Sequence, residues 1–505
     1  MHSISTALLR CRACKFARIL IMPLRRRIAY PLVLIFCFIA IVVFNTSRIA
    51  NIGGLSEKKN FNFFITDRNS KKIQSLQKSS LFENGTELMF FTNASLPIAF
   101  YNSSDFTWTP TKAAIVANLH LLRNHIHSVN EAQYIHNIDR FGKASPLFII
   151  IVQVHQRYTH LLYLIESLRR VRGIEEALVV FSHDFFSPEI NRMIAAIRFV
   201  RFTQIFFPYS RQIFLNLFPG PDPRDCHTRG AKDCLNHEWP DIAGNYRDTR
   251  FAQVKHHWIW KLCFVINKMN ISKSFNGQYI LLEEDYIVLK DMLHVLSLAK
   301  QLNTSFDVIA LGSYENLQTY NASEIVHETY WISSKHNMGM AFTKNLFQKL
   351  EPYWKNFCIY DDYNWDWSLY FIDRVCASEK LRVLHFKNCG RVFHTGSCGL
   401  HNKGSECDNV EASVVGVMER VARGGGSDEG LFPATLMVEM ATVQRSAVPP
   451  NGGWGDARDH ALCLAIVNNR WLPLAHFLPD DPSHRRLDVF EPLIPGVSDT
   501  AVSVL

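Results

Sequence analysis

The sequence predicts an α/β fold with a doubly wound, mostly parallel sheet, because apolar strands and amphipathic helices alternate from residue 146 onward. Residues 147–154 are an apolar run, which is typical of a parallel strand covered on both faces. The pattern continues with a helical stripe over 160–171, strands at 177–181 and 203–207, and a helix that Ser187 caps ahead of Pro188. This β-α-β-α-β order predicts a nucleotide-binding half. A glycine-rich phosphate motif is missing from it, which disfavours a dinucleotide.

Size and composition are those of a globular protein. A chain of 505 residues can hold one large domain or a few ordinary ones, and 48% hydrophobic residues are enough for a core. Much of the net charge of +8 lies in the first 27 residues. The sequence has no basic stripe with interleaved aromatic residues, so nucleic acid is not an expected partner. The 12 cysteines do not by themselves define a compartment.

An apolar segment near the N-terminus predicts a signal anchor. Residues 28–44 carry no charge, and roughly 17–25 such residues in a helix span a bilayer. More Arg and Lys residues precede this run than follow it closely, which keeps residues 1–27 cytoplasmic and sends the remainder across the membrane. A cleaved signal peptide is the competing interpretation. Residues 45–145 are expected to form a stem and not a packed domain.

A lumenal chain would expose six candidate glycosylation tripeptides, each of which is a weak signal alone. They begin at Asn84, Asn93, Asn102, Asn270, Asn303 and Asn321. Three of the six fall in the polar stem, which has no clear periodicity.

Three acidic residues follow a predicted buried strand at residues 279–282. Glu283, Glu284 and Asp285 repel one another if buried, so the cluster needs a counter-charge, for which a divalent cation is the usual solution. Ligands of open α/β sheets bind at the carboxyl ends of strands, which is where these acids lie. The alternative is a solvated acidic turn after a core strand.

Polar residues also follow the first two strands. Arg157 suits a phosphate and Asp184 suits a ribose or a base edge, although the two could instead pair with each other or with solvent. A long helix is predicted at 249–268, from which a lysine and histidines one turn away from Gln253 could contact a nucleotide. His257 has a plain alternative as a core residue.

A second stretch rich in acidic and aromatic residues covers 357–367, where Asp361, Asp362 and Asp366 stand among Tyr and Trp residues. Carboxylates walled by aromatic rings suit a sugar site and a general base whose pKa is set by partial burial. The alternative is the acidic first turn of an amphipathic helix. Residues 391–394 are a last short strand, and its terminal His394 is a candidate metal ligand.

Nine blocks that occur in order resemble the N-acetylglucosaminyltransferase II family of Golgi enzymes. They are Gln153-Val-His-Gln-Arg157, Phe181-Ser-His-Asp184, Asp222-Pro-Arg-Asp-Cys226, Gln253-Val-Lys-His-His257, Glu283-Glu-Asp285, His336-Asn-Met-Gly339, Asp361-Asp-Tyr-Asn-Trp-Asp-Trp367, Phe393-His394 and Asn451-Gly-Gly-Trp-Gly-Asp456. The resemblance covers about residues 146–465 and implies a GT-A glycosyltransferase fold with a nucleotide-binding and an acceptor-binding half. It further implies UDP-N-acetylglucosamine as donor, Mn²⁺ as cofactor, and inverting β-1,2 transfer to the α-1,6-linked mannose of an N-glycan core.

The resemblance also assigns roles to residues. It implies Asp366 as the general base and Asp285 and His394 as ligands of Mn²⁺. The residues that it assigns to the UDP-sugar are Gln153, Val154, His155, Gln156, Arg157, Asp184, Gln253, Val254, Lys255, His256 and His257. The disulfides that it implies are Cys226–Cys234, Cys358–Cys463 and Cys398–Cys407. Cys376 lacks its usual partner, for which Cys389 is a substitute, and Cys263 is expected to be a free core thiol.

The resemblance predicts a Golgi type II membrane protein with a lumenal catalytic domain at 146–470. Whether the chain forms a homodimer is left open. Two departures are an absent Cys-x-x-Cys before Asp307 and an atypical extension at 471–505. Residues 408–430 are expected to form an irregular loop. The alternative functions are the sibling transferase that acts on the α-1,3 mannose and an inactive glycan-binding protein of the same fold.

Overall fold

The computed structural model describes residues 112–396, 409–427, 430–442 and 449–469. All of them belong to one of the two compact units of the chain, Leu96–Leu505. The expected anchor at 28–44, the extension at 471–505 and the Cys398–Cys407 disulfide lie outside the described residues. Within the described ranges, no helix is both long and apolar enough to cross a bilayer.

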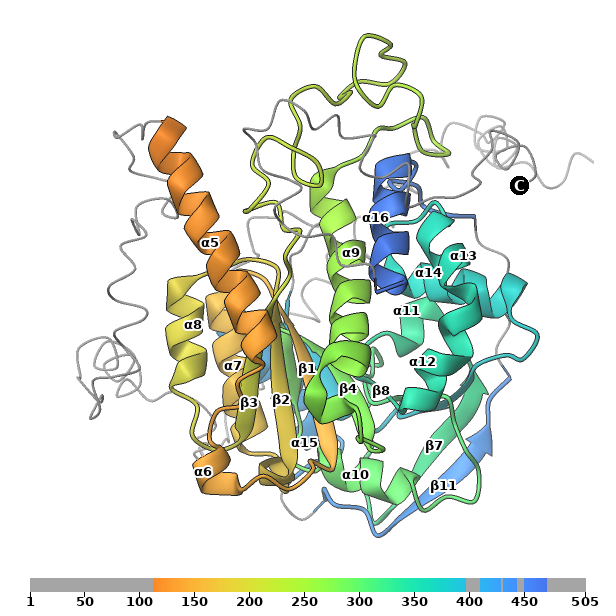
Figure 1. Cartoon of the computed structure of the whole chain (residues 1–505). Helices are drawn as coiled ribbons and strands as arrows, with labels where there is room; N and C mark the ends of the chain where they lie inside the picture. Colours follow the sequence, from red (N-terminus) through yellow and green to blue (C-terminus); the bar gives the residue numbers. More distant parts are fainter. Residues whose placement is uncertain (1–111, 397–408, 428–429, 443–448, 470–505) are drawn as a thin grey trace, which may run out of the picture. The chain divides into compact units, whose positions relative to one another are not determined.

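The first half is the predicted run of parallel strands and helices (Figure 1). Its elements are β1 (Phe148–Val154), α7 (Tyr158–Arg169), β2 (Ala177–His183), α8 (Pro188–Ala195) and β3 (Arg201–Phe206). Strand β1 pairs in parallel with β2, and β2 pairs in parallel with β3. The hydroxyl of Ser187 accepts a hydrogen bond from the Ile190 amide at 3.3 Å, which confirms the predicted cap of α8. The doubly wound half is therefore confirmed.

One large sheet runs through the described part of the chain in the order β11-β7-β9-β6-β8-β4-β1-β2-β3. The strands beyond the first three are β4 (Gln278–Glu283), β6 (Val308–Ala310), β7 (Ser323–Tyr330), β8 (Met340–Phe342), β9 (Arg382–His385) and β11 (Thr435–Met440). Strand β4 is parallel to β1, so the carboxyl ends of β1, β2 and β4 meet at one edge. A small second sheet pairs β5 (Tyr286–Val288) with β10 (Val392–His394).

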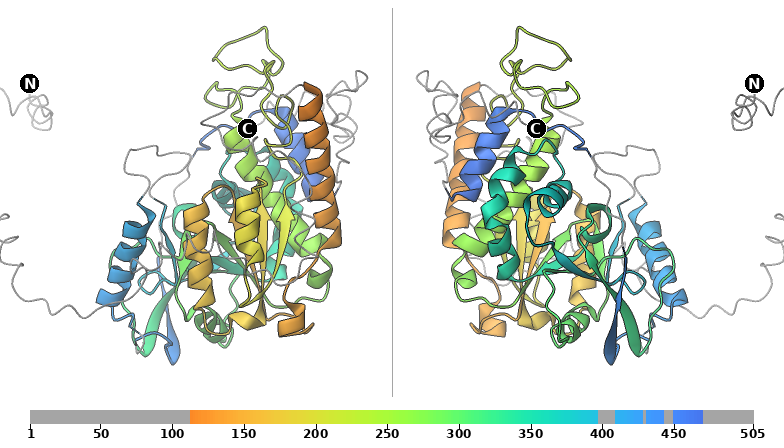
Figure 2. Two further views of the ribbon diagram at one scale, coloured as in Figure 1. Left: turned by 90° about the vertical axis from the view of Figure 1, so that its left-hand side faces the viewer. Right: turned by 90° about the vertical axis from the view of Figure 1, so that its right-hand side faces the viewer.

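Helices cover both faces of the large sheet, and α9 and α15 lie on opposite faces (Figures 1 and 2). The predicted helix at 249–268 is α9 (Thr249–Cys263), which continues as a π-helical turn over Phe264–Lys268. The other α-helices are α5 (Lys112–Ala132), α6 (Ile138–Phe141), α10 (Met292–Ala299), α11 (Ser333–His336), α12 (Lys344–Leu350), α13 (Trp354–Ile359), α14 (Trp365–Phe371), α15 (Val410–Arg423) and α16 (Ala457–Val467). Trp258 of α9 stacks on Trp365 of α14 with ring centroids 4.5 Å apart, which joins the two halves through the core.

The packed domain begins earlier than the expected boundary at residue 146. Helix α5 belongs to a segment that was expected to be stem, yet Leu122 and Ile126 are buried in the main core. Asn130 exchanges hydrogen bonds with the backbone of Phe206, which fixes α5 to β3. The sequence did not predict this helix, because only part of its surface is apolar and the segment before it is polar.

The expectation of an irregular loop over 408–430 is wrong, because most of this segment is α15. Val410, Val414, Val417 and Val421 recur at helical spacing and are buried. The side chain of Asn409 caps the helix by accepting from the Ala412 amide at 2.9 Å. The valine spacing was readable in the sequence, but the nearby glycines and serines suggested a loop.

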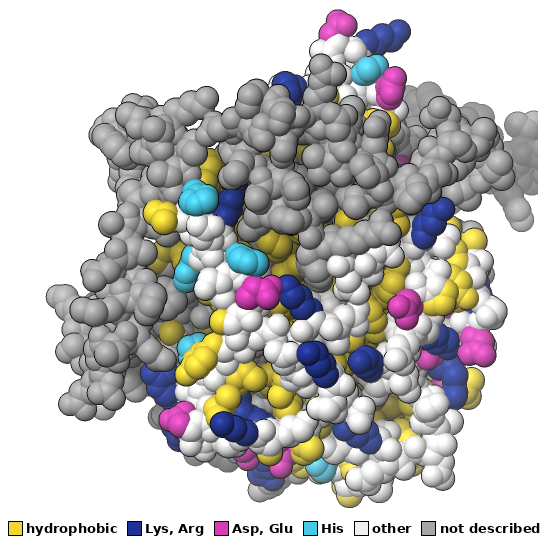
Figure 3. Space-filling view, viewed as in Figure 1, with side chains coloured by type: hydrophobic (Ala, Val, Ile, Leu, Met, Phe, Trp, Pro, Cys, Tyr) yellow, Lys and Arg dark blue, Asp and Glu magenta, His cyan; other side chains and the backbone are white. Residues whose placement is uncertain are grey.

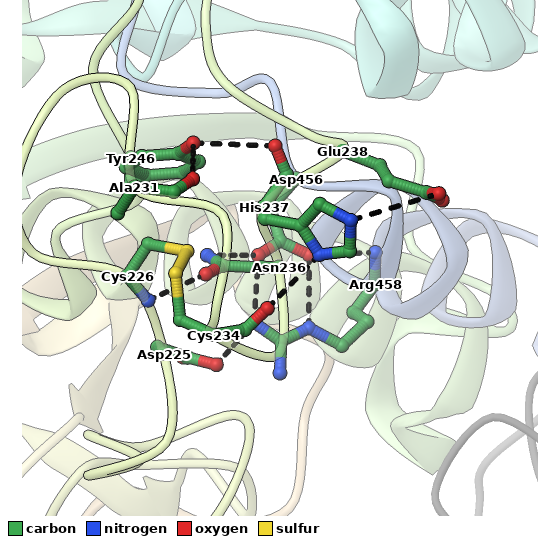
Figure 4. Close-up of a disulfide and its surroundings, with 10 residues drawn as sticks. All are labelled: Asp225, Cys226, Ala231, Cys234, Asn236, His237, Glu238, Tyr246, Asp456 and Arg458. Carbon is green, nitrogen blue, oxygen red and sulfur yellow. Dashed lines mark hydrogen bonds and ion pairs between the residues drawn. A yellow bond between two sulfur atoms is a disulfide. The ribbon is translucent and has the colours of Figure 1, made fainter.

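Two of the implied disulfides are present, Cys226–Cys234 and Cys358–Cys463. The suggested Cys376–Cys389 pair is wrong, because both thiols are free and the two residues flank opposite ends of β9. Cys263 is a buried free thiol in the core, as expected. Figure 4 shows the first disulfide beside the start of α16. Asn236 Nδ2 donates to Asp456 at 3.0 Å and Arg458 Nη2 donates to Asp225 at 2.9 Å, which connects this loop with α16.

Removing the Cys358–Cys463 disulfide with alanine at both positions is expected to lower the free energy of unfolding by about 2–5 kcal/mol. The bond closes a separation of 105 residues, so its loss frees a long loop in the unfolded chain. Urea unfolding followed by tryptophan fluorescence measures the change. The matched control is the Cys226–Cys234 double variant, whose separation of 8 residues predicts a smaller loss. An equal or larger loss in this control would contradict the loop-length argument.

Candidate active site

The acidic cluster lies where β4 ends beside β1. Gln153 of β1 is in register with Glu283, and the Glu284 amide donates to the Gln153 carbonyl at 3.0 Å. Glu284 is 6% and Asp285 is 5% exposed, so the alternative of a solvated acidic turn is wrong. These carboxylates are held inside the carboxyl edge of the sheet, where a ligand of an α/β fold binds.

Glu284 organises the loop that follows β1. Its carboxylate accepts hydrogen bonds from the backbone amides of His155, at 2.7 Å, and Arg157, at 3.2 Å. Burial raises the pKa of Glu284 to about 7, against the opposing effect of His155. This residue therefore positions the loop, and its oxygens are already engaged by protein donors.

Asp285 and His394 lie together, although they are far apart in sequence. Strand β10 pairs with β5 so that His394 is opposite Tyr286, and the Thr395 amide donates to the Asp285 carbonyl at 2.8 Å. His394 Nε2 is 3.0 Å from Asp285 Oδ2, and the Arg157 guanidinium contacts the same oxygen. Burial opposes ionisation, but His394 and Arg157 outweigh it and lower the pKa of Asp285.

The chemistry of this pair fits a divalent cation. Asp285 Oδ1 is buried and accepts no hydrogen bond, which leaves one carboxylate oxygen for a further partner. The backbone at Gly396 comes so close that an added Cβ would lie 2.6 Å from Asp285 Oδ2 and 2.9 Å from Arg157 Nη1. No group of three or more His, Cys, Asp or Glu side chains that could hold a metal occurs in the described part of the chain. The side chains that could contact a cation there are a carboxylate and an imidazole.

A second cluster surrounds Asp184 at the end of β2. Its carboxylate contacts His155 Nδ1 at 2.5 Å and accepts from Gln253 Nε2 at 3.0 Å. Burial opposes ionisation, yet His155 and the neighbouring His257 lower the pKa of Asp184 to about 2. The alternative in which Arg157 pairs with Asp184 is wrong, since each has a different partner. Asp184 is an ionised acceptor whose position suits a ribose or a base edge.

One face of α9 points at the strand ends and the other points away. Gln253 reaches Asp184, and His257 Nε2 is 2.8 Å from the Ser182 hydroxyl in the core. Lys255 instead donates to the carbonyls of Tyr360 and Asp362 at 3.1 and 2.8 Å. The expectation that this whole run contacts the nucleotide is corrected for Lys255, because residues two apart on a helix face different sides.

The side chains of two further assigned positions, His256 and Val154, are also directed away from the Asp184 cluster or into the core. His256 contacts Asp459 of α16 at 3.0 Å, on the side of α9 that faces away from β2. Val154 is fully buried, so its side chain belongs to the core. Val254 is half-buried, and Gln156 is exposed in the loop after β1.

Asp366 occupies the first turn of α14 and is 8% exposed. Its Oδ2 accepts from Asn337 Nδ2 at 2.9 Å, and Asn337 Oδ1 accepts from the Tyr314 hydroxyl at 2.8 Å. Burial raises the pKa of Asp366 to about 7, with Asn337 acting in the opposite direction. A carboxylate with this pKa exchanges a proton near neutral pH, as a general base must.

The neighbouring acids have structural roles. Asp361 accepts from the backbone amides of Ile242 at 2.6 Å and Trp454 at 3.0 Å. Asp362 is fully buried and accepts from the Asn451 amide at 2.9 Å. Asp366 differs from these two acids because its pKa is raised to about 7 and its side chain accepts a hydrogen bond from Asn337.

Electrostatic interactions connect the Asp285–His394 pair with Asp366 through two tyrosines. Tyr314 and Tyr286 both interact electrostatically with Glu283, Asp285 and Asp366, which raises the pKa of each hydroxyl beyond the effect of burial. The Asp285–His394 pair and the Asp366 carboxylate therefore lie near the same two tyrosines. On the described surface in Figure 3, Lys and Arg side chains lie scattered among acidic and polar groups.

Asn337→Ala is expected to move the acidic limb of the activity–pH profile to higher pH. The amide of Asn337 lowers the pKa of Asp366, so removing it raises that pKa further above its ordinary value, and less of the base is ionised below neutrality. Measuring kcat/KM from pH 5.5 to 8.5 checks this. Tyr314→Phe should cause a smaller shift in the same direction because it frees the Asn337 amide. An unchanged profile midpoint in Asn337→Ala would contradict a positioning role.

A sequence model of N-acetylglucosaminyltransferase II (MGAT2) matches residues 123–463. The chain belongs to the N-acetylglucosaminyltransferase II family. It is 39% identical over 355 residues to the α-1,6-mannosyl-glycoprotein 2-β-N-acetylglucosaminyltransferases of Rattus norvegicus and Homo sapiens. These matches cover 68% of this chain and 79% and 78% of the two relatives. The enzyme of the same name from Arabidopsis thaliana is 28% identical over 344 residues, with 65% and 76% of the two chains covered.

Solved structures add little to this assignment. Staphylococcus aureus TarS in complex with UDP-GlcNAc is 11% identical, covers 56% of this chain and 68% of that chain, and has a TM-score of 0.28. A similarity of this size carries no argument about ligand or mechanism.

The sequence analysis did not assign a role to three residues near these side chains, Lys261, Tyr314 and Asn337. Lys261 contacts the side chain of Gln153 and lies two turns after Gln253 and one after His257, so the spacing of four along α9 could have revealed it. Asn337 lies in the block His336-Asn-Met-Gly339, which was given no role, and Tyr314 lies in none of the nine blocks. They come from loops that only the sheet order brings beside Asp366.

Proposed function

We propose that the chain is an inverting glycosyltransferase of the GT-A fold. It moves N-acetylglucosamine from UDP-N-acetylglucosamine to the 2-hydroxyl of the α-1,6-linked mannose of an N-glycan core, in β-1,2 linkage. The observation that carries the proposal is a buried base, Asp366, with a pKa of about 7 in the same site as Asp285 and His394. The names and coverage of the relatives support the substrates.

The donor is proposed to bind at the carboxyl edge of β1, β2 and β4. Asp184, held by His155 and Gln253, offers an ionised acceptor to the ribose or the uracil. Arg157 lies next to the acidic cluster and suits the diphosphate. Asp285 and His394 are the residues that would hold Mn²⁺, which when bound neutralises charge on the departing UDP.

Asp366 is proposed to accept the proton of the mannose 2-hydroxyl. The freed oxygen pair forms the new bond to the anomeric carbon as the bond from that carbon to the UDP oxygen breaks, and the electrons leave with UDP. Attack from the face opposite UDP inverts the anomeric centre, so one base and no enzyme nucleophile are needed. Asn337 holds Oδ2 in place, while Oδ1, which also accepts from the Trp367 amide at 3.0 Å, is proposed to accept the proton through its second lone pair.

The cellular setting is part of the proposal. Residues 28–44 would anchor the chain in the Golgi membrane as a type II protein, with the described domain in the lumen. The two disulfides support an oxidising compartment, because such bonds are rare in the cytosol.

Purified full-length chain, UDP-N-acetylglucosamine, Mn²⁺ and defined acceptor glycans test the function. We expect UDP release and a new β-1,2 linkage with a glycan whose α-1,3 arm already carries N-acetylglucosamine. Release only with the unextended acceptor would identify the sibling activity on the α-1,3 mannose. Acceptor binding without UDP release would identify a glycan-binding protein, and either result would overturn the proposal.

A further inference from the structure

One Asn-x-Ser tripeptide, which begins at Asn321, leads into β7, the neighbour of the edge strand β11 in the large sheet. The carbonyl of Ala322, the middle residue, accepts hydrogen bonds from the amides of Ala434 at 2.8 Å and Thr435 at 3.3 Å. The hydroxyls of Ser323 and Thr435 are 3.0 Å apart, where β7 and β11 pair. Asn321 therefore stands directly beside the first residues of β11.

Strand β11 is an exposed edge. It pairs with β7 on one side and is the last strand in the sheet order, so within the described residues its other side has no strand partner. Met437, Val438 and Met440 are 48%, 36% and 74% exposed, and Ile325 of the adjacent β7 is 40% exposed. The strand carries one exposed charge, Glu439, but neither Lys nor Pro, which many proteins use to prevent pairing at such an edge.

We propose that Asn321 carries an N-linked oligosaccharide that covers this edge and keeps a second copy of the chain from pairing with β11. This inference rests on the lumenal orientation under the proposed function. Asn321 is exposed, and its Oδ1 accepts from the Ser323 amide at 3.1 Å. No described residue accepts a hydrogen bond from its Nδ2, the atom that bears the sugar. An oligosaccharide is bulky and solubilising, so at this position it shields the strand.

The modification requires a lipid-diphosphate-linked oligosaccharide as donor. The bond between Asn321 Nδ2 and the anomeric carbon of the first sugar forms as the bond from that carbon to the diphosphate oxygen breaks. The amide loses one proton, the electron pair leaves with the diphosphate, and nothing is oxidised or reduced. Asn321 precedes Ala434 and Thr435 in the chain, so it enters the lumen before those residues can contact its tripeptide.

Asn303 supplies a matched control. Its tripeptide is fully exposed and lies just before β6. Because β6 and β4 are both antiparallel to β8, β6 starts at the sheet edge opposite the active site. Strand β7 runs antiparallel to β9, which is parallel to β6, so Asn321 before β7 lies at the other end of the sheet. A sugar on Asn303 is thus far from the start of β11.

The full-length chain is produced in a eukaryotic secretory host and purified in mild detergent as wild type, Asn321→Gln, Ser323→Ala, Ser323→Thr and Asn303→Gln. Glycopeptide mass spectrometry reads occupancy, and size-exclusion chromatography with light scattering reads self-association. We expect Asn321 to be occupied in the wild type and in Ser323→Thr. Asn321→Gln and Ser323→Ala should show a several-fold larger self-associated fraction, which Asn303→Gln should not show.

A second change makes the result specific to the edge strand. Adding Met437→Lys to Asn321→Gln places a positive charge on β11 and should return the self-associated fraction to that of the wild type. An unoccupied Asn321, or an Asn321→Gln chain as dispersed as the wild type, overturns the inference. Transfer activity is measured on the same samples. If none of the samples is active while Asn321 is glycosylated, the proposed function is refuted, but the inference that the oligosaccharide covers β11 is not.

Discussion

Asp366→Asn is expected to abolish transfer while the chain still binds UDP. The amide is close in shape to the carboxylate and keeps an oxygen for the Asn337 donor, but it cannot accept the proton of the acceptor hydroxyl. General bases contribute roughly 10²–10⁴-fold to rate, so kcat should fall by about that factor. UDP release with a saturating acceptor measures kcat, and calorimetry with UDP and Mn²⁺ measures binding.

The matched control for this substitution is Glu189→Gln. Glu189 is also an acid in the first turn of a helix. That helix is α8, in the first half of the domain, and Glu189 is exposed there. The same change of carboxylate to amide should leave kcat unaltered there. If Asp366→Asn turns over at the normal rate, another group is the base.

Asp285→Ala is expected to remove the Mn²⁺-dependent part of UDP binding. The substitution deletes both the oxygen shared by His394 and Arg157 and the buried oxygen that accepts no hydrogen bond. Changing a group that only supports a metal ligand costs roughly 10–100-fold in metal affinity or activity, so removal of a ligand should cost at least as much. Titrating UDP with and without Mn²⁺ by calorimetry measures the effect.

Glu419→Ala provides the control for the loss of a carboxylate. Glu419 lies on the surface of α15, 3.9 Å from Arg423, and such exposed pairs contribute little. Its replacement should leave the metal dependence of UDP binding as in the wild type. Equal metal dependence in Asp285→Ala and the wild type would show that Asp285 is not a ligand.

Local sequence patterns predicted much of the fold and part of the site. The buried strands at 147–154, 177–181 and 279–282 each carry a mostly apolar run that is typical of a strand covered on both faces. The same patterns failed for α5 and α15, because polar or glycine-containing surroundings diluted a real helical stripe. The side chain of Lys255 lies away from the Asp184 cluster and donates to the carbonyls of Tyr360 and Asp362, because adjacent residues of a helix face different sides.

By itself, the sequence determined the doubly wound half and the order of the acidic and aromatic stretches, because strand and helix periodicities are local properties of the chain. Only the tertiary structure decided which acids come together and which accept hydrogen bonds from the backbone. Pairing of β5 with β10 brings His394 to Asp285, and burial among loops from distant strands gives Asp366 its pKa of about 7. Both depend on long-range contacts, and a carboxylate in the sequence looks the same whether it faces a ligand, a backbone amide or water.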